Sequence, residues 1–327
     1  GMHISGEYRY MLENMQVSRK SGDESRILPR NVIENKLEQI LLTGGEDRLN
    51  EYRDELRTIA EELGMQKEFT KINSIISALL STHDAKVLST DSAKALATGN
   101  PFDKTRVELF EVLFDAIKDR YFVTRNNRNT DEQSFRLFSF FESYFSNYIE
   151  GTEFEVDEAK AIVDSGIPMP RRDEDSHDIL GTFKVLSNRT EMMKTPTSPK
   201  ELFAILSHRH SILLEGRPHM NPGIFKTKNN RAGMTEFVDY QLVKGTLSQG
   251  FKYYAALTDP FARAIFMMFM ISEVHPFNDG NGRIARVMMN AELVRADQSR
   301  IIVPTVFRED YILALRKLTR HKEPLAY

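Results

Sequence analysis

Apolar residues recur at three- and four-residue intervals along most of this chain, which is the spacing that places them on one face of an α-helix. Segments with this spacing include residues 34–42, 47–64 and 106–122. Gly64 follows the second of these segments, at the position where a glycine commonly ends a helix. The spacing therefore predicts a mostly helical fold.

One region departs from the helical spacing. Residues 223–238, GIFKTKNNRAGMTEFV, carry two adjacent asparagines and a glycine between short apolar ends. This pattern is typical of a small β-hairpin. We therefore expect an all-α fold with one short hairpin.

The 327 residues leave room for two domains, or for one large domain with an extension. Residues 1–28 are polar and aperiodic, which indicates an N-terminal arm. The polar, asparagine-rich residues 124–133 interrupt the helical pattern. We therefore predict a helical extension over residues 29–125 and a second domain over residues 126–327.

Composition excludes several classes of protein. The chain has no cysteine, which rules out disulfides, thiol catalysis and cysteine-ligated zinc. Its formal net charge of −3, with no basic block, argues against a nucleic-acid-binding protein. No apolar run approaches the roughly 20 residues of a membrane-spanning helix, and the polar N-terminus lacks a signal-peptide core. We expect a soluble cytoplasmic protein that binds neither nucleic acid nor a membrane.

Residues 275–286, HPFNDGNGRIAR, concentrate side chains with catalytic chemistry. The preceding segment, residues 261–274, is apolar nearly all round, which predicts a helix buried at the centre of its domain. Pro276 disfavours helical geometry at the residue before it, so this helix should end near His275. The negative end of the helix dipole would then favour a protonated His275 ring and make it a better proton acceptor.

The middle of this stretch has the features of a phosphate site. Gly280, Asn281 and Gly282 let an anion approach the backbone N–H groups closely, at the positive end of the helix that follows. Arg283 and Arg286 each carry a planar fork that donates two parallel hydrogen bonds to a phosphate.

Asp279 is the only carboxylate within residues 275–286. Mg²⁺ typically takes one or two protein carboxylates together with phosphate oxygens and waters. A single carboxylate beside an anion site therefore fits a metal–nucleotide complex better than a metal held by protein groups alone. Together these residues supply a general base, a metal anchor, a phosphate site and two cations.

The stretch resembles the signature of the Fic family, His-x-Phe-x-Asp/Glu-Gly-Asn-Gly-Arg-x-x-Arg. The residues that fill its specified positions are His275, Phe277, Asp279, Gly280, Asn281, Gly282, Arg283 and Arg286. Similarity to the family extends over about residues 131–318. The resemblance implies a Fic-type helical bundle over residues 126–327, in which the hairpin is a flap that clamps the target segment by strand addition.

Most Fic proteins transfer AMP from ATP to a protein hydroxyl, so the resemblance implies a nucleotidyltransferase with ATP as cosubstrate. His275 would be the catalytic base that deprotonates a Ser, Thr or Tyr hydroxyl. Asp279 would hold Mg²⁺. Asn281 and the neighbouring N–H groups would bind the α-phosphate, and Arg283 and Arg286 the β- and γ-phosphates.

Several positions bear on the resemblance. Relatives that phosphorylate their targets have lysine at the position of Gly282, so Gly282 favours AMP transfer. The family often has arginine at the position of Lys226, a mild departure. The resemblance near the adenine, around Arg308 and Tyr311, is loose, and many relatives continue into another helix past the position of Leu318.

A second motif, Ser146-x-x-x-Glu150-Gly151, resembles the inhibitory Ser/Thr-x-x-x-Glu-Gly/Asn signature of Fic proteins whose blocking helix precedes the core. We expect this helix over residues 131–150. The helix dipole disfavours a carboxylate in the last turn, where Glu150 lies, so Glu150 should have a partner elsewhere. The family's partner for this glutamate is Arg286, and the pair would deny that arginine to the γ-phosphate.

We therefore predict an autoinhibited protein adenylyltransferase. The alternatives left open are a deAMPylase in which Glu150 aligns a water, a nucleotide-sensing interaction module with little catalysis, and transfer of another phosphate-linked group such as phosphocholine or UMP. The target protein and its modified side chain, which the chain itself could supply, are also open. So are the signal that relieves inhibition, the role of residues 1–125, and a homo-oligomeric state.

Overall fold

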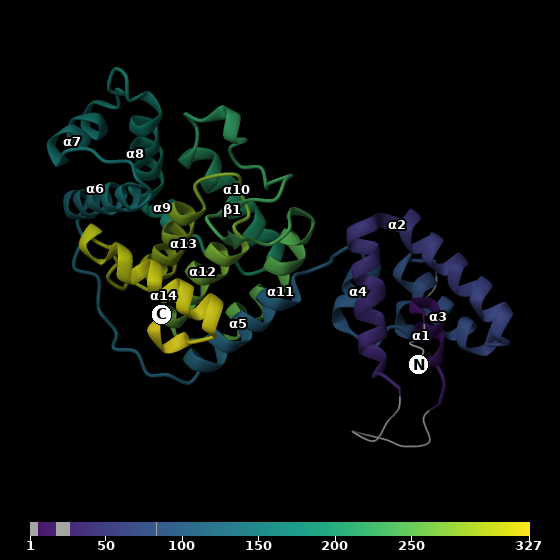
Figure 1. Ribbon diagram of the computed structural model, residues 1–327. Helices are drawn as coiled ribbons and strands as arrows, with labels where there is room; N and C mark the ends of the chain where they lie inside the picture. The colour runs from purple at the N-terminus through teal and green to yellow at the C-terminus, as the bar shows by residue number, and fades with distance from the viewer. Residues whose placement is uncertain (1–5, 18–26, 83) are drawn as a thin grey trace. The chain divides into compact units, whose positions relative to one another are not determined.

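The computed structural model describes residues 6–17, 27–82 and 84–327, and these residues are mostly helical (Figure 1). The chain divides into two compact units between Phe102 and Asp103. The described residues form one sheet, a two-stranded hairpin, so the expected all-α class with a short hairpin is confirmed. No helix in the described part of the chain has the length and apolarity needed to cross a membrane.

The sequence predicted a boundary after residue 125, whereas the two units divide earlier in the chain, after Phe102. Helix α5 (Lys104–Ile117) belongs to the second unit because its apolar face is buried in that unit's core. The Phe110 ring packs edge-on against Phe266 and Phe269, with centroid separations of 6.1 and 6.2 Å. Periodicity identified the helix but could not show which core it joins.

The first unit is a small helical bundle. Its elements are α1 (Glu7–Glu13), α2 (Arg30–Leu63), α3 (Gln66–Leu79), η2 (Ala85–Val87) and α4 (Asp91–Ala97). Gly64 ends α2 in a left-handed conformation, as its position predicted. The expected arm over residues 1–28 is corrected at α1, which buries Met11 and Leu12 in this unit's core. The rest of that arm lies mostly outside the described residues.

The second unit is a larger bundle built around α12 and α13, which pack against each other along their length. Besides α5, its elements are α6 (Glu132–Ile149), α7 (Val156–Ser165), α8 (Asp173–Leu186), α9 (Arg189–Met192), α10 (Pro199–Leu213), η3 (Pro218–Met220), β1 (Arg231–Ala232), β2 (Thr235–Glu236), η4 (Tyr240–Leu242), α11 (Val243–Ala256), α12 (Pro260–Val274), α13 (Asn281–Arg295), η5 (Thr305–Phe307), α14 (Arg308–His321) and η6 (Pro324–Ala326).

Helix α12 is buried on nearly every side, which confirms the expectation drawn from its uniform apolarity. The Asp259 side chain accepts a hydrogen bond from the Ala262 N–H and so caps the first turn, where Pro260 needs no partner. The helix ends at His275, whose φ of 52° reverses the chain. A centrally buried α12 holds the following loop in a fixed place.

The hairpin lies within residues 223–238, as predicted. Strand β1 pairs with β2 in antiparallel register, with Arg231 opposite Glu236. Two arginines from other elements hold it: Arg106 Nη2 donates to Glu236 O at 2.6 Å, and Arg320 Nη2 donates to Thr235 Oγ1 at 3.2 Å. Contacts from α5 and α14 therefore fix the position of the hairpin beside the end of α12.

Candidate functional site

The loop between α12 and α13 is held by its own side chains. Asn281 Oδ1 accepts from Phe277 N at 2.8 Å, and Asn281 Nδ2 donates to Phe277 O at 2.8 Å. The Asn281 amide therefore spans the loop. The structure places it next to the expected phosphate site, but its side chain is engaged by the loop backbone.

His210, which the sequence analysis did not assign, supports the same loop from α10. Its ring stacks on Phe277, with centroids 3.7 Å apart and an interplanar angle of 6°. His210 Nδ1 accepts from the Gly223 N–H, so Nε2 carries the proton and donates to Asp279 O at 2.9 Å. Burial lowers the pKa of His210 to about 4, so this ring is neutral. Only a long-range contact could have shown this role.

His275 has a defined tautomer. Its Nδ1 lies 3.2 Å from Ser272 O, and a carbonyl oxygen can only accept, so Nδ1 carries the proton. Nε2 is then the unprotonated nitrogen. The Phe237 ring, next to the hairpin, stacks on the imidazole at 3.5 Å with an interplanar angle of 4°. This arrangement leaves Nε2 able to accept a proton.

The expected effect of the helix dipole on His275 is corrected. Burial lowers the pKa of His275 to about 4, with a further lowering by Lys226, and this outweighs the influences that favour the charged ring. Sequence position indicated the helix end but not the degree of burial. His275 is thus neutral at neutral pH, which is the form that a general base requires.

This shift has a measurable consequence. The pKa of His275 in the folded protein lies below its ordinary value of 6.5. Proton uptake therefore favours unfolding, and the stability contributed by neutral His275 is complete above pH 6.5 and is lost as the pH falls towards 4. In an NMR titration, the His275 ring protons should show a midpoint below pH 5. A midpoint at or above 6.5 would contradict the burial argument.

Glu150 lies over the N-terminal turn of α13. A Cβ atom added at Gly282 would overlap Glu150 Oε1, so the carboxylate occupies the space above that glycine. Gly280, with a φ of 71°, precedes the first turn as its N-cap. The space where an anion would approach the helix N-terminus is therefore filled by an anionic side chain of the same chain.

The predicted contact between Glu150 and Arg286 is present. Arg286 Nη2 lies 2.6 Å from Glu150 Oε1, and Arg286 Nε and Nη2 donate to Ser146 Oγ and Ser146 O, each at 2.9 Å. Burial raises the pKa of the Glu150 carboxyl, but the Arg286 guanidinium more than offsets this, so the net pKa is below its ordinary value. Glu150 is therefore ionised at neutral pH.

Helix α6 carries Glu150 and has the bounds that the sequence predicted, within one residue at each end. Asp131 caps its start, accepting from Ser134 N, and Gly151 follows its end with a φ of 97°. About two turns before Glu150, Glu142 accepts from Asn290 Nδ2 at 2.7 Å and from Arg300 Nη1 at 3.0 Å. Burial raises the pKa of Glu142 to about 7. In the sequence, the four-residue spacing of Glu142, Ser146 and Glu150 would have indicated a row of polar residues on one face of α6. We call this row the polar seam; it contacts Asn290 and Arg286 of α13.

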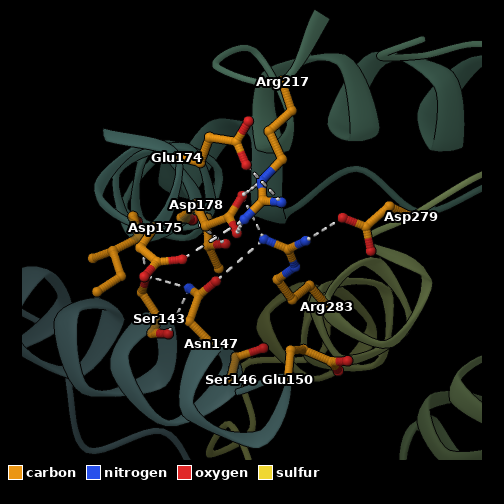
Figure 2. Close-up of polar contacts among 12 residues, drawn as sticks. Ser143, Ser146, Asn147, Glu150, Glu174, Asp175, Asp178, Arg217, Asp279 and Arg283 are labelled. Atoms are coloured by element: carbon orange, nitrogen blue, oxygen red, sulfur yellow. Dashed lines mark hydrogen bonds and ion pairs between the residues drawn. The ribbon is translucent and has the colours of Figure 1, made fainter. Parts of the chain in front are cut away.

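Arg283 and Arg286 contact different side chains. Its Nη1 lies 2.8 Å from Asp178 Oδ1 and 3.4 Å from Asn147 Oδ1 (Figure 2). Its Nη2 lies 3.3 Å from Asp279 Oδ2. Neither Asp178 nor Asn147 was predicted from the sequence, because both lie on helices distant in sequence from Arg283.

Asp279 could contribute one carboxylate to a metal site. Its side chain is 38% exposed, and the described residues contain no cluster of three or more acidic, histidine or cysteine side chains that could hold a metal. One carboxylate with room for solvent suits Mg²⁺, which takes its remaining ligands from phosphates and waters.

A cavity of about 250 Å³ lies beside His275, Glu150 and Arg286. Its lining includes Glu150, Phe237, His275, Gly282, Arg286, Arg308 and Tyr311. Burial raises the pKa of the Tyr311 hydroxyl, which lies beside the Arg286 guanidinium. His275 and the Glu150–Arg286 pair thus line one cavity.

Part of the chain matches a known protein family. Residues 200–293, which include the whole stretch 275–286, match the model of the Fic/DOC family. The residues that are similar to the Fic/DOC family therefore include His275, Asp279, Arg283 and Arg286, whereas Glu150 lies outside the matched residues.

Two curated relatives are named protein adenylyltransferases. Protein adenylyltransferase Fic from Nematostella vectensis is 27% identical over 183 residues, covering 51% of this chain and 40% of the relative. Protein adenylyltransferase fic-1 from Caenorhabditis elegans is 25% identical over 177 residues, covering 53% of this chain and 35% of the relative. The matches thus span less than half the length of either relative.

A solved structure of Fic-1 from C. elegans, residues 134–508, aligns with 91% of this chain and 88% of that chain. The sequence identity is 17% and the TM-score is 0.48.

Proposed function

We propose that this chain is an autoinhibited protein adenylyltransferase that transfers AMP from ATP to a Ser, Thr or Tyr hydroxyl of a protein. The observation that carries this proposal is the shared cavity, in which neutral His275 lies with Arg286 at the N-terminus of α13. The names of the curated relatives support the same activity.

In the proposed reaction, His275 Nε2 accepts the proton of the target hydroxyl. The hydroxyl oxygen attacks the α-phosphorus of ATP, a new P–O bond forms, and the bond to the pyrophosphate breaks. The N–H groups at the start of α13 stabilise the phosphate charge, and Arg286 binds the terminal phosphate once Glu150 leaves it. A Mg²⁺ held by Asp279 would neutralise phosphate charge.

We propose that Glu150 is the brake. Its carboxylate takes the hydrogen bond of Arg286 that a γ-phosphate would accept, and it places a negative charge where the triphosphate would lie. ATP would then bind without the alignment that transfer needs. Ser146 and the polar seam at Glu142 hold α6 in this position.

The hairpin supports the proposed role of a flap. Its strands lie beside His275, and the adjoining Phe237 packs on the imidazole. An extended target segment could add to a hairpin edge by main-chain hydrogen bonds and present its hydroxyl to His275.

ATP labelled at different phosphates tests the reaction. The Glu150→Gly variant, incubated with Mg²⁺ and a lysate as target, should add label from α-³²P-ATP and none from γ-³²P-ATP to the label that the lysate incorporates alone. Added label from the γ position would show phosphorylation by the variant and contradict the proposal. Loss of label when wild type is added to the labelled protein would instead indicate AMP removal, with Glu150 as a productive residue.

A further inference from the structure

Asp178 lies outside the Fic signature, on α8, yet it shares its carboxylate between two arginines. Asp178 Oδ1 accepts from Arg283 Nη1 at 2.8 Å and from Arg217 Nε at 3.0 Å. Asp178 Oδ2 accepts from Arg217 Nη2 at 2.6 Å. Figure 2 shows the carboxylate between the two guanidiniums, with Asp279 on the far side of Arg283. All of these groups lie in the second unit.

Burial makes this arrangement rigid. Asp178 is buried, and the Arg283 side chain is only 3% exposed. An arginine side chain has many rotamers, and ordering it costs conformational entropy. Contacts with three elements fix the Arg283 guanidinium: α8 through Asp178, α6 through Asn147, and the loop before α13 through Asp279.

The three contacts are unequal. The bond to Asp178 is the shortest, and its acceptor is a buried carboxylate, which makes charge-assisted hydrogen bonds strong. Asn147 is neutral and 3.4 Å away. Asp279 is partly exposed and is the residue that would bind Mg²⁺, so its hold on Arg283 weakens when a metal–nucleotide is present. Asp178 is the anchor that remains.

We propose that Asp178 is a positioning residue: it holds the Arg283 guanidinium at the N-terminus of α13, where that guanidinium binds the phosphates beyond the α-phosphate, and Arg217 holds Asp178 in turn. This inference rests on the proposed function. Asp178 contacts no nucleotide in this scheme. Asp178 acts by positioning Arg283, so it should affect the affinity only for ligands that carry β- and γ-phosphates.

Nucleotide affinity, measured by calorimetry with Mg²⁺ in the Glu150→Gly background, tests the role of Asp178. Asp178→Asn should weaken ATP binding by at least about tenfold, equivalent to ~1.4 kcal/mol, because Arg283 loses its charged anchor. AMP lacks the phosphates that Arg283 contacts, so its affinity should change less than about twofold.

The matched control is Glu174→Gln. Glu174 lies on the same helix, its side chain is 55% exposed, and it contacts Arg217 at 3.3 Å. It should leave the affinities for ATP and AMP unchanged. Equal weakening of ATP and AMP by Asp178→Asn would overturn the inference in favour of a merely structural role, and so would an unchanged affinity for ATP.

A second variant covers the case in which Asp178→Asn does not fold. Arg217→Gln removes the guanidinium that holds Asp178 but keeps the Asp178 carboxylate. It should weaken the binding of ATP by about two- to fivefold and leave the binding of AMP unchanged. If Arg217→Gln does not weaken the binding of ATP more than that of AMP, the inference is overturned. If the Glu150→Gly parent neither binds ATP nor becomes labelled, the proposed function itself fails, so the two failures are distinguishable.

Discussion

Replacing Glu150 by glycine is expected to raise the initial rate of AMP transfer by at least about tenfold. The Glu150–Arg286 contact is a charge-assisted hydrogen bond of 2.6 Å, a class of interaction worth roughly 1.5–3 kcal/mol. Each 1.4 kcal/mol is a factor of about ten in an equilibrium, so removing it shifts the population strongly towards a free Arg286. The measurement is the rate of α-³²P incorporation at a fixed ATP concentration.

Glu153→Gly is the matched control, because Glu153 lies three residues further on and is exposed. It makes the same change in charge and backbone, and its rate should stay within about twofold of wild type. Thermal unfolding of both variants separates activation from partial unfolding. Equal rates for wild type and Glu150→Gly would show that the pair does not restrain catalysis.

Replacing His275 by alanine is expected to reduce the transfer rate by about 10²- to 10⁴-fold, the range that a positioned general base contributes. The effect is measured in the Glu150→Gly background, where the uninhibited rate leaves room for a large decrease. His275 Nε2 is unprotonated because Nδ1 donates to Ser272 O, and burial keeps the ring neutral.

His208→Ala controls for the loss of a histidine. His208 is on α10, and its side chain is 56% exposed. Its removal should leave the rate within about twofold. Because the His275 ring packs on Phe237, the alanine variant is also compared by thermal unfolding and by ATP binding. A folded, ATP-binding His275→Ala variant whose rate falls less than tenfold would exclude His275 as the base.

Local patterns predicted the elements that carry the site. Uniform apolarity identified α12, the break at Pro276 identified its end, and the asparagine–glycine stretch identified the hairpin. The contact between Glu150 and Arg286, which are 136 residues apart, came from the resemblance of two motifs to one family. Each of these predictions rests on residues that are close in sequence or on a motif long enough to be specific.

Predictions that depended on packing were less successful. The helix-dipole argument for His275 considered one interaction, whereas burial of the ring dominates its pKa. The spacing of Arg283 and Arg286 did not show which side chains they contact. Asp178 on α8 and Asn147 on α6 contact Arg283, and Ser146 on α6 contacts Arg286. Spacing along one helix cannot show which neighbouring helices face it.

One gel tests the proposed transfer and its brake together. Wild type, Glu150→Gly and Glu150→Gly with His275→Ala are each incubated with α-³²P-ATP, Mg²⁺ and lysate, and the label on protein is measured. We expect faint label with wild type, strong label with Glu150→Gly and none with the double variant. Strong and equal label with wild type and Glu150→Gly would contradict inhibition by Glu150, and no label in any sample would contradict adenylyl transfer.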